Sequence, residues 1–314
     1  MGKLKFGLFI GNSGPLASPE LIRDMADQAD RNGYDGVWTN EHVMPAHTID
    51  YEWPNKGHYI PHYGVQSTLA YLAARTKRVR LGCSVQVLPY HQTFELAKAI
   101  ATLDQLSDGR AIVGAAPGWN RQEMEYLGFR DFAERGKFAD EALEVMIALW
   151  TQATPSYEGR WHRFGPTDWE PKPRQKPHPP IWIGGESVPA IRRAARFGSG
   201  LILSHMPVDW LETHLPKLRA EMAARGRADE PLEVGFYYNV KLLRDGRRID
   251  RPLDRRKSSA GYWLEGPSET FVEDLRRWEA AGITYPVVRI YGQSHDDVLA
   301  QLRIFDEEIK PHVA

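Results

Sequence analysis

The sequence predicts an α/β fold in which eight parallel strands close into a (β/α)8 barrel. Three observations carry this prediction: β-rich runs alternate with helical patterns along the whole chain, eight such pairs fit into 314 residues, and no shift in composition divides the chain. We therefore expect one domain over residues 1–314, with excursions near 44–66, 152–179 and 244–267. The functional site of such a barrel lies where the carboxyl ends of the strands meet the loops that follow them.

Runs of β-branched and other apolar residues, each bounded by turn residues, are predicted to be the strands. Side chains of this kind suit the pleated, half-buried surface of a sheet. In chain order the predicted strands cover residues 4–10, 36–39, 79–87, 111–115, 181–183, 201–203, 232–243 and 284–290.

The helices between them are predicted from apolar residues three or four positions apart. Ser18 is placed to cap the first helix and Gly33 to end it, because hydroxyl side chains favour helix starts and glycine favours the residue after a helix. The predicted helices follow in chain order. The first begins at 19, the second contains Leu69, Leu72 and Ala73, the third covers 94–106 and the fourth carries Glu123 in its first turns. The fifth covers about 138–150, the sixth begins at 189, the seventh covers 208–225 and the last contains Val298, Leu302 and Phe305.

Two stretches interrupt the alternation. Residues 172–180 are too rich in proline to be helical, so we interpret them as an excursion rather than a linker between domains. Residues 244–266 are polar and hold the charge run 254–257. A charge run of this kind is typical of a solvated loop, and a contact with a partner or a phosphate is the alternative.

The balance of charges excludes several classes of partner. Lys and Arg number 40 against 41 Asp and Glu, so a net charge of -1 leaves no electrostatic footprint for nucleic acid or an anionic membrane. No apolar run approaches the roughly 20 residues that span a bilayer, and the amino terminus lacks a signal-peptide pattern. The single cysteine, Cys83, cannot form an intramolecular disulfide. We expect a soluble cytoplasmic protein whose partner is a small-molecule substrate.

Several familiar kinds of site are absent from the sequence. It has no G-x-S-x-G motif and no Walker loop, and Gly198-Ser199-Gly200 lacks the third glycine of a dinucleotide fingerprint. The histidines of the loop after the second strand have neither a cysteine pair nor an H-E-x-x-H frame, so we expect no metal site from them. They are His42, His47, His58 and His62.

The dipeptide Glu41-His42 stands at the end of the second strand, which a barrel places at the mouth of the active site. A histidine there can exchange a proton near neutral pH, and an adjacent carboxylate or amide can fix its tautomer. A structural histidine bonded to backbone fits the dipeptide itself equally well. The position favours a functional role.

Two glycine-bearing turns also follow strands. In Gly184-Gly185-Glu186-Ser187, Ser187 is placed to cap a helix, and bare glycine amides there can approach an anion. Glu186 opposes that role unless its carboxylate turns away, and a tight turn with positive φ explains the glycines equally well. In the turn 114–120, Trp119 fits the wall of an aromatic ligand site or a buried core position. The small residues of 82–84 fit a close backbone approach to something flat, or core packing.

Many sequence motifs of this chain are uninformative singly, but they occur together and in one order. The stretches are Phe6-Gly7-Leu8-Phe9, Gly33-Tyr34-Asp35-Gly36-Val37-Trp38 with Glu41-His42, Arg78-Val79-Arg80-Leu81-Gly82, Ala97-Lys98, residues 101–110, Gly118-Trp119-Asn120 with Glu123, Glu134-Arg135-Gly136, Pro171-Lys172-Pro173 and Ile181-Trp182-Ile183-Gly184-Gly185. Jointly they resemble the bacterial luciferase-like family of flavin and deazaflavin oxidoreductases, over nearly the whole chain.

The resemblance implies a luciferase-like (β/α)8 (TIM) barrel with insertion loops at the carboxyl face, which binds FMN or coenzyme F420 there. By the same resemblance, His42 matches the family's catalytic histidine, which Glu41 would orient. Ser84-Val85 matches a bulge with a non-prolyl cis peptide that backs the cofactor ring. The implied cofactor-binding residues are Ser84, Val85, Gly118, Trp119, Asn120, Gly184, Gly185 and Ser187.

The resemblance leaves the cofactor open between two kinds of chemistry. FMN-using members carry a phosphate-gripping arginine where this chain has Pro117, which favours F420 and hydride transfer to or from a small organic substrate. Ala46 opposes this choice, because some deazaflavin members have a ring-contacting tryptophan there. The alternative is a two-component monooxygenase that uses FMNH2 and O2 and depends on a separate reductase. A cofactor-free binding protein on the same barrel is the third hypothesis.

The substrate is the least specified partner. Candidate pocket residues are chosen for lying at strand ends or in the loop after the second strand, and they are Tyr63, Tyr90, His205 and Arg289. Aromatic residues in 51–63 fit a lid over an apolar or flat molecule, and a loop packed on itself fits them equally. Family members are often dimers, so the resemblance implies a homodimer.

Overall fold

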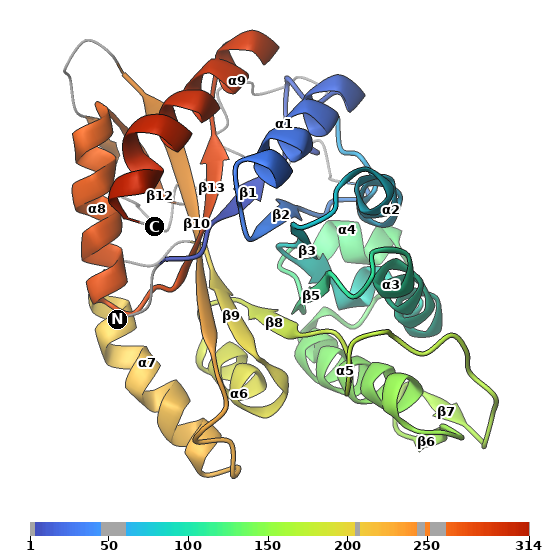
Figure 1. The fold of residues 1–314 in the computed structure, drawn as a ribbon. Coiled ribbons are helices and arrows are strands. Elements are labelled where there is room, and N and C mark those ends of the chain that lie inside the picture. Colours follow the sequence, from blue (N-terminus) through green and yellow to red (C-terminus); the bar gives the residue numbers. More distant parts are fainter. Residues whose placement is uncertain (1–3, 45–60, 205–207, 244–248, 252–261, 314) are drawn as a thin grey trace.

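The fold is a closed barrel of eight parallel strands, as the sequence predicts (Figure 1). The computed structural model describes residues 4–44, 61–204, 208–243, 249–251 and 262–313. Around the ring the strands are β1 (Gly7–Phe9), β2 (Gly36–Thr39), β3 (Arg80–Cys83), β5 (Ala111–Ala116), β8 (Ile181–Gly184), β9 (Gly200–Leu203), β10 (Glu233–Leu242) and β13 (Tyr285–Ile290). Pairing of β13 with β1 closes the ring. Each predicted strand corresponds to one of these eight.

Helices surround the strands on the outside of the barrel (Figure 1). They are α1 (Pro19–Arg31), α2 (Val65–Arg75), α3 (Thr93–Leu106), α4 (Arg121–Tyr126), α5 (Arg135–Thr151), α6 (Val188–Phe197), α7 (Val208–Ala223), α8 (Ser268–Ala280) and α9 (His295–Ile304). The predicted boundaries of α1 are confirmed: the Ser18 hydroxyl accepts a hydrogen bond from the amide of Leu21 at 3.1 Å, and Gly33 has a φ of 71°. The sequence patterns above delimit no helix at α8. No helix in the described part of the chain is both long and apolar enough to cross a bilayer.

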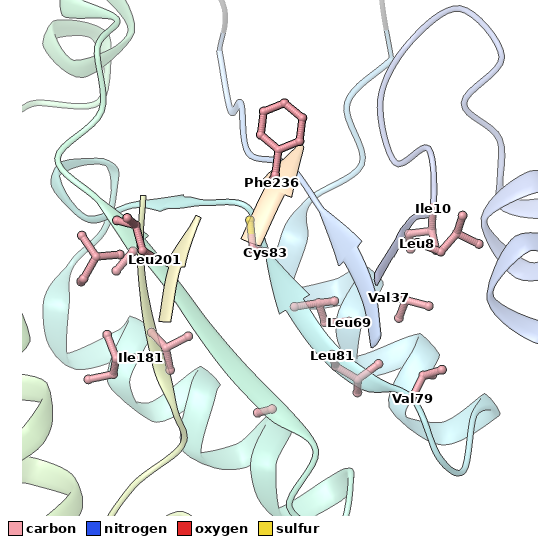
Figure 2. Close-up of a cluster of buried hydrophobic side chains, with 14 of the residues drawn as sticks. Leu8, Ile10, Val37, Leu69, Val79, Leu81, Cys83, Ile181, Leu201 and Phe236 are labelled. Atoms are coloured by element: carbon pink, nitrogen blue, oxygen red, sulfur yellow. The ribbon is translucent and has the colours of Figure 1, made fainter. Parts of the chain in front are cut away.

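The main hydrophobic core lies between the strands and the helices. Consecutive side chains of a strand point to opposite faces of the sheet, so one set faces outward. Figure 2 shows Leu8, Val37 and Leu81 from the first three barrel strands gathered with Leu69 of α2 in this layer. The outward layer explains why the helices carry apolar residues on one face.

A second set of side chains fills the inside of the barrel. Trp38, Trp182 and Tyr285 come from three different strands, and the ring centroids of the two tryptophans are 4.9 Å apart. Glycines in neighbouring strands make room for these rings: a Cβ at Gly82 would lie 2.7 Å from Cζ3 of Trp38. Core packing is therefore the explanation for Gly82. Because the interior is packed, ligand chemistry is confined to the mouth of the barrel.

Two of the predicted excursions contain strands. Within 152–179, β6 (Tyr157–Glu158) and β7 (Arg163–Phe164) form an antiparallel hairpin. Within the polar stretch 244–266, the structure forms two strands that were not predicted: β11 (Ile249–Arg251) pairs with β12 (Tyr262–Gly266), and β12 extends the edge of β10 in parallel. The long β10 makes this possible, since its last residues continue beyond its pairing with β9. The charge run 254–257 and residues 45–60 lie outside the described residues.

Candidate active site

His42 lies three residues beyond the end of β2, and its ring reaches a carboxylate from another strand end. Nδ1 of His42 is 2.8 Å from Oε2 of Glu123, which belongs to α4 after β5. The amides of Val43 and Met44 donate to Oε1 of the same carboxylate, at 2.6 and 2.9 Å. The loop after β2 is thereby tied through its histidine and two amides to the loop after β5.

Glu123 is fully buried and is held from a third direction as well. The hydroxyl of Tyr90 donates to its Oε2 at 2.9 Å, and Nδ2 of Asn120 donates to the same oxygen at 3.1 Å. Burial raises the pKa of Glu123, but the hydrogen bond and charge of His42 and the two loop amides outweigh burial and hold the pKa at about 2. The carboxylate is therefore ionised at neutral pH.

The prediction that Glu41 orients His42 is wrong. The Glu41 side chain is buried and its two oxygens are engaged elsewhere: the amide of Val87 donates to Oε2 at 2.6 Å, and Nε2 of His91 lies 2.9 Å from Oε1. Glu41 and His42 lie two and three residues beyond the end of β2, and their side chains contact different neighbours. Glu41 therefore holds the segment after β3, while the carboxylate beside His42 comes from Glu123, 81 residues away.

The segment after β3 carries the predicted bulge. The Ser84–Val85 peptide is cis, as the family resemblance implies, and it lies between β3 and the short β4 (Gln86–Val87). The amide of Ser84 donates to the carbonyl of Thr39 at the end of β2, at 2.7 Å. Val85 packs against the cluster that fills the barrel interior. The bulge therefore forms part of the inner rim of the mouth.

Glycines on the next two strands around the ring make space for this bulge. A Cβ at Gly114 of β5 would overlap the carbonyl oxygen of Cys83, and a Cβ at Gly184 of β8 would lie 2.6 Å from Cγ1 of Val85. Neither glycine has a positive φ, so close approach rather than turn geometry explains both. The two neighbouring strands β5 and β8 thus carry no side chain where the bulge meets them.

The turn from Gly118 to Asn120 places an aromatic ring beside His42. Gly118 has a φ of 73°, and a Cβ there would overlap the side chain of Val87. Trp119 is 55% exposed, so it is not a core residue, and its ring centroid is 6.1 Å from that of His42 in an edge-to-face arrangement. Asn120 caps α4 and directs its side-chain amide to Glu123. The predicted residues of this turn therefore do meet at the site, with Asn120 acting through Glu123.

The turn from Gly184 to Ser187 has the predicted local form. Ser187 caps α6, where its hydroxyl accepts from the amide of Ala190 at 3.3 Å, and Gly185 has a φ of 117°. The Glu186 carboxylate turns toward the end of β9 and accepts from the amide and hydroxyl of Ser204, at 2.9 and 3.2 Å. Ser204 thereby fixes the position of this carboxylate, which keeps its negative charge, and an anion-binding role for the turn stays a prediction.

The substrate candidates separate into different places. Tyr90 meets His42 through Glu123, whereas the Tyr63 ring packs against the main hydrophobic core. The guanidinium of Arg289 lies 4.5 Å from the ring centroid of Phe9, a residue of the cluster inside the barrel. His205 lies outside the described residues. Tyr90 and Arg289 are thus placed at the barrel mouth or its interior, and Tyr63 is not.

One residue beside His42 has no functional signal in the sequence. The ring centroid of His62 is 5.3 Å from that of His42. Burial and then the neighbouring His42 lower the pKa of His62 to about 4, so this ring is neutral at pH 7. His62 precedes α2, and only the tertiary bridge between Ser13 and His62 brings it to the mouth. A sequence pattern could not have found it.

Together these residues form a site able to exchange a proton next to an exposed aromatic wall. The His42 imidazole is the group that can take and give a proton, Glu123 is an anion on its Nδ1 side, and Trp119 is the exposed wall. Within the described part of the chain, no group of three or more His, Cys, Asp or Glu side chains is arranged to hold a metal ion.

Several proteins of known sequence are similar to this chain. An uncharacterised protein of Mycobacterium tuberculosis is 38% identical over 179 residues, a match that spans 57% of this chain and only 62% of that relative's length. An F420-dependent glucose-6-phosphate dehydrogenase of Nakamurella multipartita is 26% identical over an alignment of 330 positions, which covers 94% of this chain and 93% of that one. An FMNH2-dependent dimethylsulfone monooxygenase of Pseudomonas putida is 28% identical over 208 residues, covering 66% of this chain and 54% of that one.

Solved structures extend the likeness to the whole fold. A monooxygenase from Streptomyces bottropensis superimposes with a TM-score of 0.78 at 25% identity, over 99% of this chain and 100% of that one. A coenzyme F420-dependent tetrahydromethanopterin reductase from Methanopyrus kandleri has a TM-score of 0.79 at 18% identity, over 100% of both chains, and shows the shared fold. A family model described as luciferase-like monooxygenase matches residues 4–245. The chain therefore belongs to the luciferase-like monooxygenase family, whose relatives include F420-dependent and FMNH2-dependent enzymes.

Proposed function

We propose that this protein is an F420-dependent oxidoreductase that transfers hydride to or from a small organic substrate at the mouth of its barrel. The observation that carries the proposal is the meeting of His42, Trp119 and the Ser84–Val85 bulge at that mouth. A proton-exchanging ring, an aromatic wall and a bare backbone rim are the parts that a flat redox cofactor requires of a protein.

The residues present fit a flat heterocycle. Gly114 and Gly184 leave no side chains where the bulge meets the neighbouring strands, so the rim offers backbone and the small side chain of Val85. Gly185 and Ser187 would lie beside an anionic group of the cofactor at the start of α6, where the helix N-terminus favours negative charge and Glu186 is held by Ser204. When bound, a deazaflavin supplies or accepts the hydride.

The chain's own residues would manage the proton and exclude water. His42 would exchange a proton with the substrate at the nitrogen that Glu123 does not engage. Trp119 would cover one side of the reacting groups, because its exposed ring stands edge-on to His42. Tyr90 supports the pair through its bond to Glu123, and Arg289 is the candidate for contact with a polar part of the substrate.

The choice of F420 over FMN rests on two observations. By the family resemblance, Pro117 stands where FMN-using members have a phosphate-gripping arginine, so position 117 does not supply that contact. The F420-dependent dehydrogenase of Nakamurella multipartita aligns over 94% of the chain, whereas the FMNH2-dependent monooxygenase of Pseudomonas putida aligns over 66%. The second candidate function is a two-component FMNH2 monooxygenase with a separate reductase. The 28% identity of this chain to the Pseudomonas putida monooxygenase favours that function.

Binding measurements test the proposal. Purified protein is titrated with oxidised and reduced F420 and with oxidised and reduced FMN, and fluorescence gives each Kd. We expect F420 to bind at least tenfold more tightly than FMN, and turnover with reduced F420 to be the same with and without oxygen. Tighter binding of reduced FMN with oxygen uptake would support the monooxygenase instead. Binding of neither cofactor would leave a cofactor-free binding protein.

A further inference from the structure

We propose that Glu123 is the positioning residue of the site: it fixes the His42 ring as the tautomer protonated on Nδ1, so that Nε2 is the atom that takes and returns the proton. This inference rests on the proposed function for its catalytic consequence, while the tautomer itself is a property of the protein alone.

The first step is the donor set around Glu123. Oε1 accepts from the amides of Val43 and Met44, and Oε2 accepts from Tyr90 and Asn120 and faces Nδ1 of His42. The side chain is fully buried. A protonated carboxyl would have to place its own hydrogen among these donors, so only the ionised form satisfies them all. The pKa of about 2 agrees with this reasoning.

The second step follows from the chemistry of a carboxylate. An ionised carboxylate only accepts hydrogen bonds, so the His42 nitrogen 2.8 Å away must donate and must carry a hydrogen. In a neutral imidazole the other nitrogen is then the acceptor. Nε2 is thereby the basic atom, and the imidazolium formed when it takes a proton lies beside a buried negative charge.

The third step separates this role from a purely structural one. Glu123 also ties the backbone of residues 43 and 44, so its loss would lower stability whether or not it orients the ring. Among the described side chains that contact the pair, Tyr90 and Asn120 are neutral donors, and His62 is held neutral. The carboxylate of Glu41 is engaged by Val87 and His91. Among these groups, Glu123 alone can select the tautomer.

The experiment measures the tautomer in protein without cofactor. The chain has 11 histidines, so uniformly 15N-histidine-labelled protein is compared with His42→Gln, which identifies the signals of residue 42. In the wild type above neutral pH, we expect Nδ1 of His42 to give the signal of a protonated nitrogen and Nε2 that of an unprotonated one. The reverse pattern in the wild type would overturn the proposal without any further variant.

Glu123→Gln provides the second arm, with Glu125→Gln as the matched control. Glu125 lies on the same short helix, two residues away, with a 45% exposed side chain 4.0 Å from Arg121. We expect Glu123→Gln to lose the Nδ1-protonated pattern and Glu125→Gln to keep it. If F420 turnover is established, kcat should fall at least about tenfold in Glu123→Gln with little change in KM. A wild-type tautomer pattern in Glu123→Gln would contradict the proposal, whereas failure of F420 to bind would contradict only the proposed function.

Discussion

The side chain of Val85 packs directly against the bare Cα of Gly184. A Cβ at residue 184 would lie 2.6 Å from Cγ1 of Val85 and 3.4 Å from Cβ of Ala116, so even alanine must displace the bulge or the strand. Because the bulge forms the inner rim of the mouth, we expect Gly184→Ala to weaken F420 binding at least tenfold. The measurement is a fluorescence titration of each purified protein with F420.

The control for this substitution is Gly165→Ala. Gly165 lies in the excursion between β7 and β8, and a Cβ there would meet no atom within 4 Å. We expect its F420 affinity and its Tm to match those of the wild type. Gly184→Ala is also expected to lose about 1–3 kcal/mol of stability from overpacking. Wild-type F420 affinity in folded Gly184→Ala would show that the rim does not touch the cofactor.

Replacing Trp119 tests the aromatic wall without disturbing the fold. Its ring is 55% exposed and stands 6.1 Å from His42, so Trp119→Ala removes little buried surface. We expect unfolding free energy to change by less than about 0.5 kcal/mol. F420 affinity should fall by roughly three- to tenfold, the worth of about one aromatic contact. Tyr126→Ala is the control, because Tyr126 is also half exposed and lies on α4; an equal loss in both variants would argue against a specific wall.

The sequence was sufficient for the barrel because each strand is a local pattern. Short apolar runs between turn residues mark all eight strands, and Ser18 and Ser187 mark helix starts through bonds that span three residues. The strands β11 and β12 were not predicted. β12 does contain a short apolar run, Tyr262-Trp263-Leu264, but the run stands in a stretch that is otherwise polar. β12 pairs with the extended end of β10 and β11 pairs with β12, and no local pattern reveals either pairing.

The candidate site also contains residues that local sequence patterns locate and residues that only long-range contacts bring together. The sequence placed His42, Trp119 and the Ser84–Val85 bulge at the mouth because each follows a strand. It could not identify the partner of His42, because adjacency suggests Glu41 while the contact comes from Glu123 across the barrel mouth. Nor could it identify His62, whose place depends on the bridge to Ser13. Local motifs thus locate the site, and long-range contacts decide which groups meet there.

Glu41→Gln distinguishes the two carboxylates of the site. Glu41 is buried and holds the amide of Val87 and the ring of His91, so losing its charge weakens the segment that carries the bulge. We expect a loss of about 1–3 kcal/mol in unfolding free energy by chemical denaturation. The His42 tautomer should remain that of the wild type. A changed tautomer in Glu41→Gln, with Glu123 intact, would restore the role first predicted for Glu41.

The packed barrel interior predicts a stability effect that leaves the mouth alone. A Cβ at Gly200 would lie 2.5 Å from an atom of the Trp182 ring. We expect Gly200→Ala to cost about 1–3 kcal/mol of unfolding free energy, and the smaller ring of Trp182→Phe to recover part of that cost in the double variant. Purely additive effects of the two substitutions would contradict the direct contact. F420 affinity of the folded Gly200→Ala protein should equal that of the wild type.

The carboxylate of Glu123 makes the fold sensitive to acid in a defined window. Burial raises its pKa, but His42 and the loop amides outweigh burial and hold it at about 2, below the ordinary 4.5. The unfolded chain therefore binds more protons than the folded one between these values, so this contribution to stability is complete above pH 4.5 and is lost as the pH falls toward 2. Its size is on the order of 3 kcal/mol.

Glu123→Gln should remove this acid sensitivity, because glutamine does not titrate. We expect the difference in unfolding free energy between wild type and Glu123→Gln to be largest between pH 6 and 4.5 and to shrink steadily below pH 4.5. His62 acts in a separate window: its pKa, lowered to about 4 by burial and then by His42, makes wild-type stability fall between pH 6.5 and 4, and because the Glu123 charge raises this pKa, the fall is somewhat larger in Glu123→Gln. Urea unfolding at several pH values measures both windows. A difference between the two proteins that stays constant from pH 6 to pH 3 would mean that Glu123 is not the acid-sensitive group.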